Sequence, residues 1–432
     1  MSMKTNLRLA CAAVALLFLT ATQVPAAENR QAEVRAALWD TFDVVRQATW
    51  WNDFDGSFNP APAEDAWCGE DGCGCVIGDC KPLDIWAQAE FLMWWTKGTF
   101  VPPLVTTTNQ PNVPRAQAGR LGFATTDILF GNEQLGDEIQ AGVRLDIGIW
   151  LDPCHNVGLG ARTYGLEGDA EGFFADSAGD PTLAIPYFNP LLNQEDALLI
   201  AYIDPMTGPA KAGNVAVDYN TTFVGTDVYT RIMMERSEIT RIDLIGGYSY
   251  MRVADNLTLR ANYISFDVVD NGFTYNIRDT FAATNTIHGG MLGLMGRRGR
   301  GRWSLDWLAK ATLGANRQTV RIAGATVITP PALPPAAFAG GVFAQPSNIG
   351  FYANSQTVVV PEITCNLNYH MNSNWSIGIG YNLMWISSVA TAGRQIDRVV
   401  DLQQVIPRPA FNGFTTDDHW VQGINMSLRA DY

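Results

Sequence analysis

Apolar and polar residues alternate along much of the chain after residue 84. Between residues 138 and 150, apolar side chains from Ile139 to Ile149 occupy the odd positions, while polar residues and glycines occupy the even positions. A period of two places successive side chains on opposite faces of a β-strand. The pattern therefore predicts a strand with one apolar face and one polar face.

Ten stretches of this kind predict ten strands. They cover residues 84–96, 138–150, 157–168, 217–234, 240–252, 286–296, 303–316, 357–370, 375–386 and 419–432. Four short connections, at 152–156, 236–238, 297–302 and 371–374, alternate with five connections of about thirty residues or more. Bacterial outer-membrane barrels have short periplasmic turns and long extracellular loops. We therefore expect an all-β fold, a closed antiparallel transmembrane barrel of about ten strands, with twelve possible, spanning residues 84–432.

Tryptophans lie at the ends of several predicted strands, on their apolar faces. Trp375 and Trp385 share one face and lie ten residues apart. Ten residues at about 3.3 Å each, tilted by about 40°, rise roughly 25 Å, which is the height of the apolar band between aromatic girdles. Their spacing is typical of a strand that crosses a membrane.

The first 27 residues have the features of a secretory signal peptide. Lys4 and Arg8 precede a short apolar run, and small residues at Ala26 and Ala27 offer a cleavage site. The run is shorter than the roughly 20 apolar residues that a membrane helix needs. We therefore expect export, removal of residues 1–27, and location in the outer membrane of a bacterial cell.

Residues 28–83 are predicted to form an N-terminal periplasmic segment. Residues 29–54 could form one helix, and a cysteine cluster follows at Cys68, Cys73, Cys75 and Cys80. The oxidising periplasm favours two disulfides among these cysteines, in any of three pairings. A metal site is the alternative, but the usual spacing of two residues between ligands is absent.

Net charge excludes some partners. The formal charge of −14 leaves no basic stripe to neutralise phosphates, so no nucleic-acid partner is expected. We expect neither a cofactor nor a metal in the barrel, since no phosphate-binding loop or zinc-binding helix motif occurs. The expected partners are outer-membrane lipid and the barrel-assembly machinery, which would recognise the C-terminal strand that ends at Tyr432.

Charged residues on the polar faces of the strands predict a lumen lined with ion pairs. The predicted lumen-facing acids are Glu90, Glu138, Asp146, Asp227, Asp243, Asp306, Glu362 and Asp431, and the bases are Arg144, Arg162, Arg231, Arg241, Lys310 and Arg429. Charges removed from bulk water need partners. Because about ten strands enclose little space, side chains should fill the lumen.

Several sequence motifs resemble a known family. Residues 86–98 (WAQAEFLMWWTKG) and 101–107 (VPPLVTT) resemble its opening strand and loop. His288-Gly289-Gly290 with 300–306 (RGRWSLD), and 395–398 (QIDR) with 420–425 (WVQGIN), resemble later parts. The family is the beta-barrel porin seven family of bacterial outer-membrane proteins, and the resemblance covers about residues 84–432. It implies the fold and the location, whereas its porin label is only a weak argument for transport.

Two functions therefore compete. A narrow porin-like channel for small solutes agrees with the barrel and with the family label. The alternative is a non-conducting envelope protein whose long extracellular loops make structural or surface contacts. A third possibility, an outer-membrane hydrolase, rests only on His419 beside Asp417 and Asp418, so we expect no enzyme and no catalytic residues.

Overall fold

The computed structural model describes residues 84–431, almost all of which form or connect β-strands. The predicted signal peptide (residues 1–27), the segment 28–83 with its cysteine cluster, and Tyr432 lie outside the described residues. No helix between residues 84 and 431 is long and apolar enough to cross a membrane.

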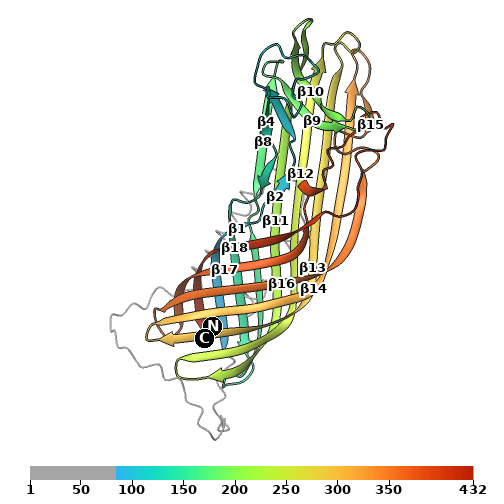
Figure 1. Ribbon diagram of the computed structural model, residues 1–432. Coiled ribbons are helices and arrows are strands. Elements are labelled where there is room, and N and C mark those ends of the chain that lie inside the picture. The colour runs from blue at the N-terminus through green and yellow to red at the C-terminus, as the bar shows by residue number, and fades with distance from the viewer. Residues whose placement is uncertain (1–83, 432) are drawn as a thin grey trace. The chain divides into compact units, whose positions relative to one another are not determined.

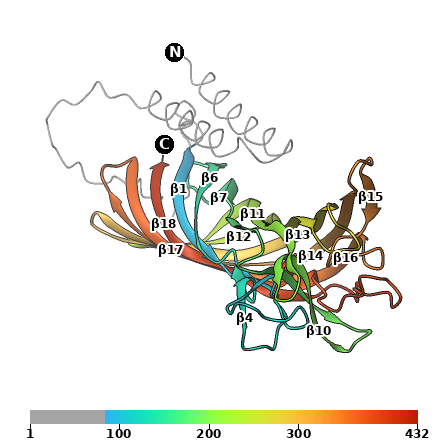
Figure 2. The ribbon, with the colours of Figure 1, turned by 90° about the horizontal axis from the view of Figure 1, so that it is seen from above.

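Ten strands pair side by side into a closed antiparallel ring. Their bounds are β1 (Ile85–Thr96), β6 (Ile139–Trp150), β7 (Val157–Leu166), β11 (Gly208–Arg236), β12 (Thr240–Ser265), β13 (Thr274–Arg300), β14 (Trp303–Thr329), β16 (Gly350–His370), β17 (Trp375–Ala390) and β18 (Thr416–Asp431). The ring runs from β1 through β6 and β7 to β11, then through β12, β13, β14, β16 and β17 to β18. The pairing of β18 with β1, visible in Figure 2, closes it. The predicted closed barrel of about ten strands is confirmed.

Short turns lie at one end of the ring, here called the short-turn end. They cover residues 151–156, 237–239, 301–302 and 371–374, close to the predicted positions. The opposite end, the long-connection end, carries the remaining links. The first residue of β1, Ile85, and the last residue of β18, Asp431, therefore both lie at the short-turn end.

The long connections are more regular than we predicted. Strands β11 to β14 are 26 to 29 residues long, whereas a tilted strand crosses a membrane in about 9–11 residues. The link between β12 and β13 therefore shrinks to residues 266–273, so the expectation of about thirty residues or more was wrong there. Alternation continues beyond the predicted strand ends because the extended strands bury one face in a further core.

Additional strands build that core at the long-connection end (Figure 1). They are β2 (Thr99–Val101), β3 (Val105–Thr108), β4 (Thr126–Phe130), β5 (Glu133–Leu135), β8 (Ala170–Ser177), β9 (Leu183–Asn189), β10 (Gln194–Asp204) and β15 (Ala336–Ala339), with a short 3₁₀ helix η1 (Gly393–Gln395). A hydrophobic cluster that includes Leu104, Ile200 and Phe343 lies between these strands and the extended ring strands. The long connections therefore form an ordered β-structure with its own core.

Side chains in the ring alternate between lumen and exterior as the sequence pattern requires. On β6, Arg144 and Asp146 are buried, whereas Val143 and Ile147 are each 39 % exposed. Trp303 and Trp385 also lie on the exposed outer face. The exterior is thus apolar, as expected for a surface that contacts lipid.

Candidate functional site

The middle of the lumen holds a network of buried ion pairs. Glu362 of β16 lies among three bases: its carboxylate is 3.0 Å from the Lys310 Nζ, 3.6 Å from the Arg144 guanidinium and 3.9 Å from the Arg162 guanidinium. Each base also has a second acid. Arg144 pairs with Glu90, Lys310 with Asp227, and Arg162 with Asp146 at 2.8 Å. Opposite charges from six strands therefore meet across the lumen.

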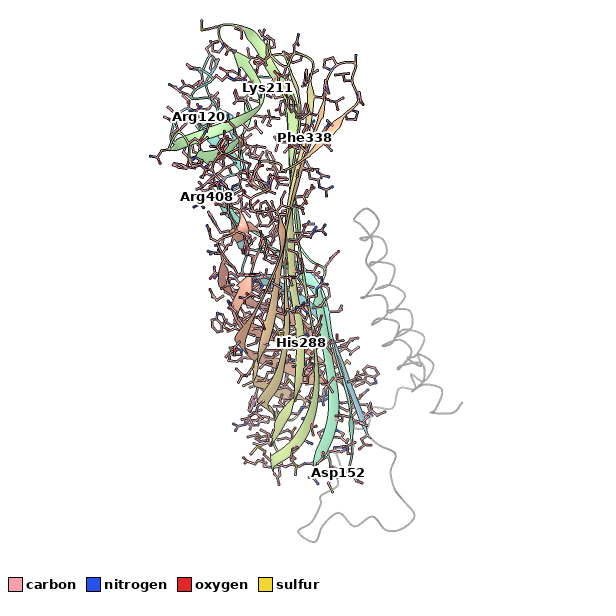
Figure 3. The ribbon with its side chains drawn as sticks, turned by 90° about the vertical axis from the view of Figure 1, so that its right-hand side faces the viewer. Arg120, Asp152, Lys211, His288, Phe338 and Arg408 are labelled. Atoms are coloured by element: carbon pink, nitrogen blue, oxygen red, sulfur yellow. The ribbon has the colours of Figure 1, made fainter. Side chains whose placement is uncertain are left out.

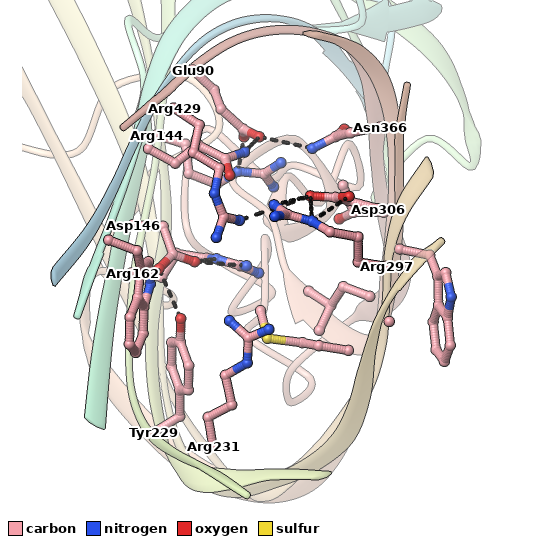
Figure 4. Close-up of a pocket in the computed structure, with 17 residues that line it drawn as sticks. Glu90, Arg144, Asp146, Arg162, Tyr229, Arg231, Arg297, Asp306, Asn366 and Arg429 are labelled. Atoms are coloured by element: carbon pink, nitrogen blue, oxygen red, sulfur yellow. Dashed lines mark hydrogen bonds and ion pairs between the residues drawn. The ribbon is translucent and has the colours of Figure 1, made fainter. Parts of the chain in front are cut away.

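A second group of ion pairs lies nearer the short-turn end. Asp243 pairs with Arg231 and, at 2.9 Å, with Arg241. Asp306 pairs with Arg297 at 2.8 Å and lies 3.8 Å from Arg429, which binds Asp431 at 2.8 Å. We call the two groups together the lumen network; Figure 4 shows part of it.

The lumen network brings together thirteen of the fourteen predicted lumen charges. The exception is Glu138, which is exposed in a bend just before β6, so its placement in the lumen was wrong. There it acts on Glu171 of β8: burial, with the nearby carboxylates Asp169 and Glu138, raises the pKa of Glu171. The alternation of apolar and polar residues alone could not locate the residue at which β6 begins.

Sequence reasoning missed one charged member of the network, Arg297. It was assigned to a turn, but β13 continues to Arg300, and the side chain of Arg297 reaches Asp306 on β14. With Glu138 excluded and Arg297 included, the lumen network contains seven acids and seven bases. The excess of acids inferred from the sequence therefore disappears.

Uncharged polar side chains complete the network. The Tyr229 hydroxyl donates to Asp146 at 2.7 Å, and the Trp86 indole N–H donates to the same carboxylate at 3.1 Å. Asn366 donates to Glu90 at 3.1 Å. Hydrogen bonds help to offset the cost of burying a charge, and these groups supply them to Asp146 and Glu90.

A layer of apolar side chains fills the lumen next to the network, on the side of the long connections. We call it the hydrophobic plug; it comprises Leu92, Trp94, Tyr164, Leu166, Phe223, Met251, Val253, Ile287, Val358, Val360, Met384, Ile386, Val389 and Val421. Leu92 follows Glu90 by two residues on β1, and Tyr164 follows Arg162 by two on β7, so each lies on the same inner face. Leu92, Trp94 and Met384 have no exposed surface.

The long-connection mouth of the barrel is crossed by residues 387–396, here called the mouth segment. The paired register of β17 with β16 ends at Met384, whereas its pairing with β18 continues to Ala390. On the side that β16 leaves free, side chains of β12, β13 and β14 hold the chain. The Asn316 amide donates to the carbonyl oxygen of Ser388 at 2.8 Å, and the Ala392 N–H donates to Asp255 at 2.9 Å. Asn285 binds both backbone groups of Ala390. The mouth segment therefore covers the plug.

A small cavity lies between the charged side chains of the lumen. This cavity has a volume of about 70 Å³ and lies among the charged residues shown in Figure 4, with Trp86, Asn366 and Arg429 in its lining. A water molecule needs at least about 10–15 Å³ of such space, so the cavity holds a few waters and no larger solute. Between residues 84 and 431, no cluster of three or more His, Cys, Asp or Glu side chains could hold a metal ion.

The residues considered for the third possibility, a hydrolase, are His419, Asp417 and Asp418, and the three do not form a hydrogen-bonded group. The carboxylates of Asp417 and Asp418 bind Lys97 at 3.1 and 2.5 Å, and Asp417 also binds Arg394 at 2.5 Å. The His419 side chain points into the lumen and is buried. Among the described residues, no hydrogen bond joins His419 to either aspartate, so this histidine has no carboxylate to orient it as a general base.

Three solved outer-membrane protein structures resemble the chain only distantly. The outer membrane protease OmpT from Escherichia coli is 8 % identical, with a TM-score of 0.36 over 82 % of this chain and 99 % of its own. A Pseudomonas aeruginosa FadL homologue is 9 % identical, with a TM-score of 0.20 over 81 % of this chain and 90 % of its own. The outer membrane channel DcaP of Acinetobacter baumannii is 8 % identical, with a TM-score of 0.13 over 81 % and 96 %. At these values the comparisons carry no functional inference.

Comparison at the level of sequence families is more specific. No curated protein matches the chain. A family model described as Putative beta barrel porin-7 (BBP7) matches residues 86–432, the region that begins with the first ring strand. With its closed ten-stranded ring and apolar exterior, the chain belongs to this family of outer-membrane β-barrels.

Proposed function

We propose that the barrel is a membrane anchor closed to solutes. We further propose that the β-structure at its long-connection end faces outward and makes surface contacts; we call it the extracellular β-structure. The hydrophobic plug is the observation that carries this proposal. An ion crossing it would lose its hydration shell against Leu92, Trp94 and Met384, none of which has exposed surface. Burying an unpaired charge in such a layer costs several kcal/mol or more.

The extracellular β-structure supports a role in contacts. Its core gives the long connections a defined shape, and apolar side chains project from their tips. Met206, Val268 and Val269 are each more than nine-tenths exposed. Exposed apolar groups on an ordered surface favour association with another molecule.

A narrow porin-like channel for small solutes is the second candidate, favoured by the family description and by the small polar cavity below the plug. It requires the mouth segment and the plug to move. Because the lumen network contains equal numbers of acids and bases, we expect no charge preference from it.

Conductance in planar lipid bilayers separates the two candidates. We expect the purified barrel to give no stable current steps. Trp94→Ala should create an ion leak by opening the plug, whereas Trp95→Ala, the next residue with its ring on the outer face, should not. Stable steps from the wild-type protein would establish the channel and overturn the closed anchor.

Export and orientation belong to the same proposal. Residues 1–27 would be removed as a signal peptide, residues 28–83 would remain in the periplasm with the short turns, and the long connections would face outward. Cell fractionation, N-terminal sequencing and gels with and without boiling test this. A soluble periplasmic protein without a heat-dependent mobility shift would refute it.

A further inference from the structure

A second cavity lies in the extracellular β-structure, and none of its lining residues belongs to the lumen network. Its volume is about 410 Å³, within the range of small-molecule sites. Arg115, Arg120 and Lys211 line it together with one carboxylate, Asp196, and the aliphatic side chains of Leu198 and Leu199. Figure 3 labels Arg120 and Lys211 in this part of the protein. We call this cavity the basic pocket.

Two of the three bases already have acidic partners. Arg120 pairs with Asp196 at 2.8 Å. Arg115 binds Asp267 through two nitrogens, at 2.6 and 3.2 Å. These pairs fix the two guanidinium groups and neutralise them.

Lys211 differs from the other two bases. It is only 9 % exposed, and among the described residues no carboxylate lies within 4 Å of its ammonium group. The nearby acids are engaged elsewhere: Asp267 with Arg115, and Asp270 with the hydroxyls of Ser265 at 2.7 Å and Tyr275 at 2.8 Å. The ammonium group lies 4.7 Å from the centroid of the Tyr263 ring, which attracts a cation but does not neutralise it.

A largely buried lysine without a carboxylate partner is unfavourable, and the backbone that carries Lys211 belongs to the sheet. Lys211 is held in the sheet between Tyr202 of β10 and Ser265 of β12. The Tyr202 hydroxyl donates to the carbonyl oxygen of Val113 at 2.9 Å, which fixes the segment that carries Arg115 and Arg120. Lys211 is therefore held in the pocket by paired strands on both sides.

We propose that the basic pocket binds a small organic anion. A carboxylate or phosphate group would pair with Lys211, and an aliphatic portion would pack on Leu198 and Leu199. The inference rests on the proposed surface role, because it gives the extracellular β-structure a ligand class. It does not depend on whether the barrel conducts.

Calorimetric titration of the full barrel in detergent tests the site, with hexanoate and inorganic phosphate as separate probes. We expect saturable binding of at least one probe, and the better probe identifies the anionic group. Lys211→Met should weaken it roughly 10- to 100-fold, the loss of one charge-assisted contact. Lys211→Arg should retain part of the affinity for that probe. Arg321→Met, which removes an exposed base from the outer face of β14, should have no effect.

If Lys211→Met fails to fold, as judged by loss of the heat-dependent mobility shift, a second measurement on the wild-type protein tests the site. The bound probe should then protect Lys211 of the wild-type protein from an amine-reactive reagent, as read by mass spectrometry. No saturable binding, or equal binding by wild type and folded Lys211→Met, would overturn the anion site. Anion binding by a barrel that also conducts would refute only the closed anchor.

Discussion

The side-chain amide of Asn285 binds Ala390 in both directions: it donates to the carbonyl oxygen at 2.8 Å and accepts from the backbone N–H at 2.9 Å. The Asn285 side chain thus makes the two backbone hydrogen bonds that a neighbouring strand would make with Ala390. It lies on β13, whereas Ala390 ends β17, and these strands are not neighbours in the ring. The contact therefore ties the mouth segment to β13, three strands away in the ring.

Asn285→Ala should loosen the mouth segment. It leaves buried backbone groups of Ala390 without partners, which costs about 1–3 kcal/mol. We expect faster hydrogen exchange at Ala390 and Ala392, and brief current flickers if the plug follows. Asn276→Ala, on the exposed face of the same strand, is the matched control. Unchanged exchange at Ala390 would show that the segment is held by other contacts.

Arg144→Ala should destabilise the barrel more than any outer-face arginine substitution. It removes the partner of Glu90 and one of three bases around Glu362, and breaking a buried pair typically costs about 3–5 kcal/mol. Urea unfolding followed by gel mobility measures this.

A double variant separates charge from packing at the same site. Arg144→Met with Glu90→Gln removes both charges and should recover part of the lost stability, because no unpaired carboxylate remains at position 90. If the single and double variants unfold at the same urea concentration, pairing of these two residues does not stabilise the lumen.

Leu145→Arg tests the facing of β6. Leu145 lies between the buried Arg144 and Asp146 and has the opposite parity, so the new charge would face hydrocarbon. The expected cost is about 2–4 kcal/mol near the bilayer midplane. Met206→Arg, at an exposed position in the long connections, should assemble normally. Equal urea resistance of Leu145→Arg and wild type would contradict the lipid-facing assignment.

Asp152 should make the turn between β6 and β7 sensitive to acid. Burial would raise its pKa, but N–H groups of Asn156, Val157 and Cys154 donate to the carboxylate and hold the pKa below the usual value. Because the folded pKa is the lower one, its contribution is present above about pH 4, the unfolded pKa, and is lost as the pH falls through the folded pKa.

Asp152→Asn tests this linkage. Hydrogen exchange at Val157 should be faster in the variant at pH 7, and the difference from wild type should shrink as the pH is lowered below about 4. A difference that does not change with pH would mean that the charge of Asp152 is not what stabilises the turn.

The cysteine cluster at residues 68–80 remains predicted to form two disulfides. Alkylation of the denatured, unreduced protein followed by mass spectrometry should leave Cys68, Cys73, Cys75 and Cys80 unmodified. Cys365, a free cysteine on the outer face of β16, should be modified and serves as the internal control. Stoichiometric zinc, with free thiols after chelation, would favour the metal site instead.

Local alternation by itself determined the ring. Each strand has one face toward lipid and one toward the lumen, so a period of two identifies the strand, its facing and its inward charges; Arg144 and Asp146 needed no tertiary information. Alternation carries no information about where a strand starts, because polar residues continue into the adjoining bend. That is why Glu138 was misplaced and why Arg297 was assigned to a turn.

Tertiary structure decided how the lumen is closed. The partners of Glu362 come from strands far apart in the sequence, and only the order and stagger of the ring bring Lys310, Arg144 and Arg162 to it. The same holds for the mouth segment: nothing local to Ala390 indicates that Asn285, more than a hundred residues earlier, will bind its backbone. Such contacts depend on closure of the whole sheet, so the sequence pattern predicted a barrel but could not show what fills it.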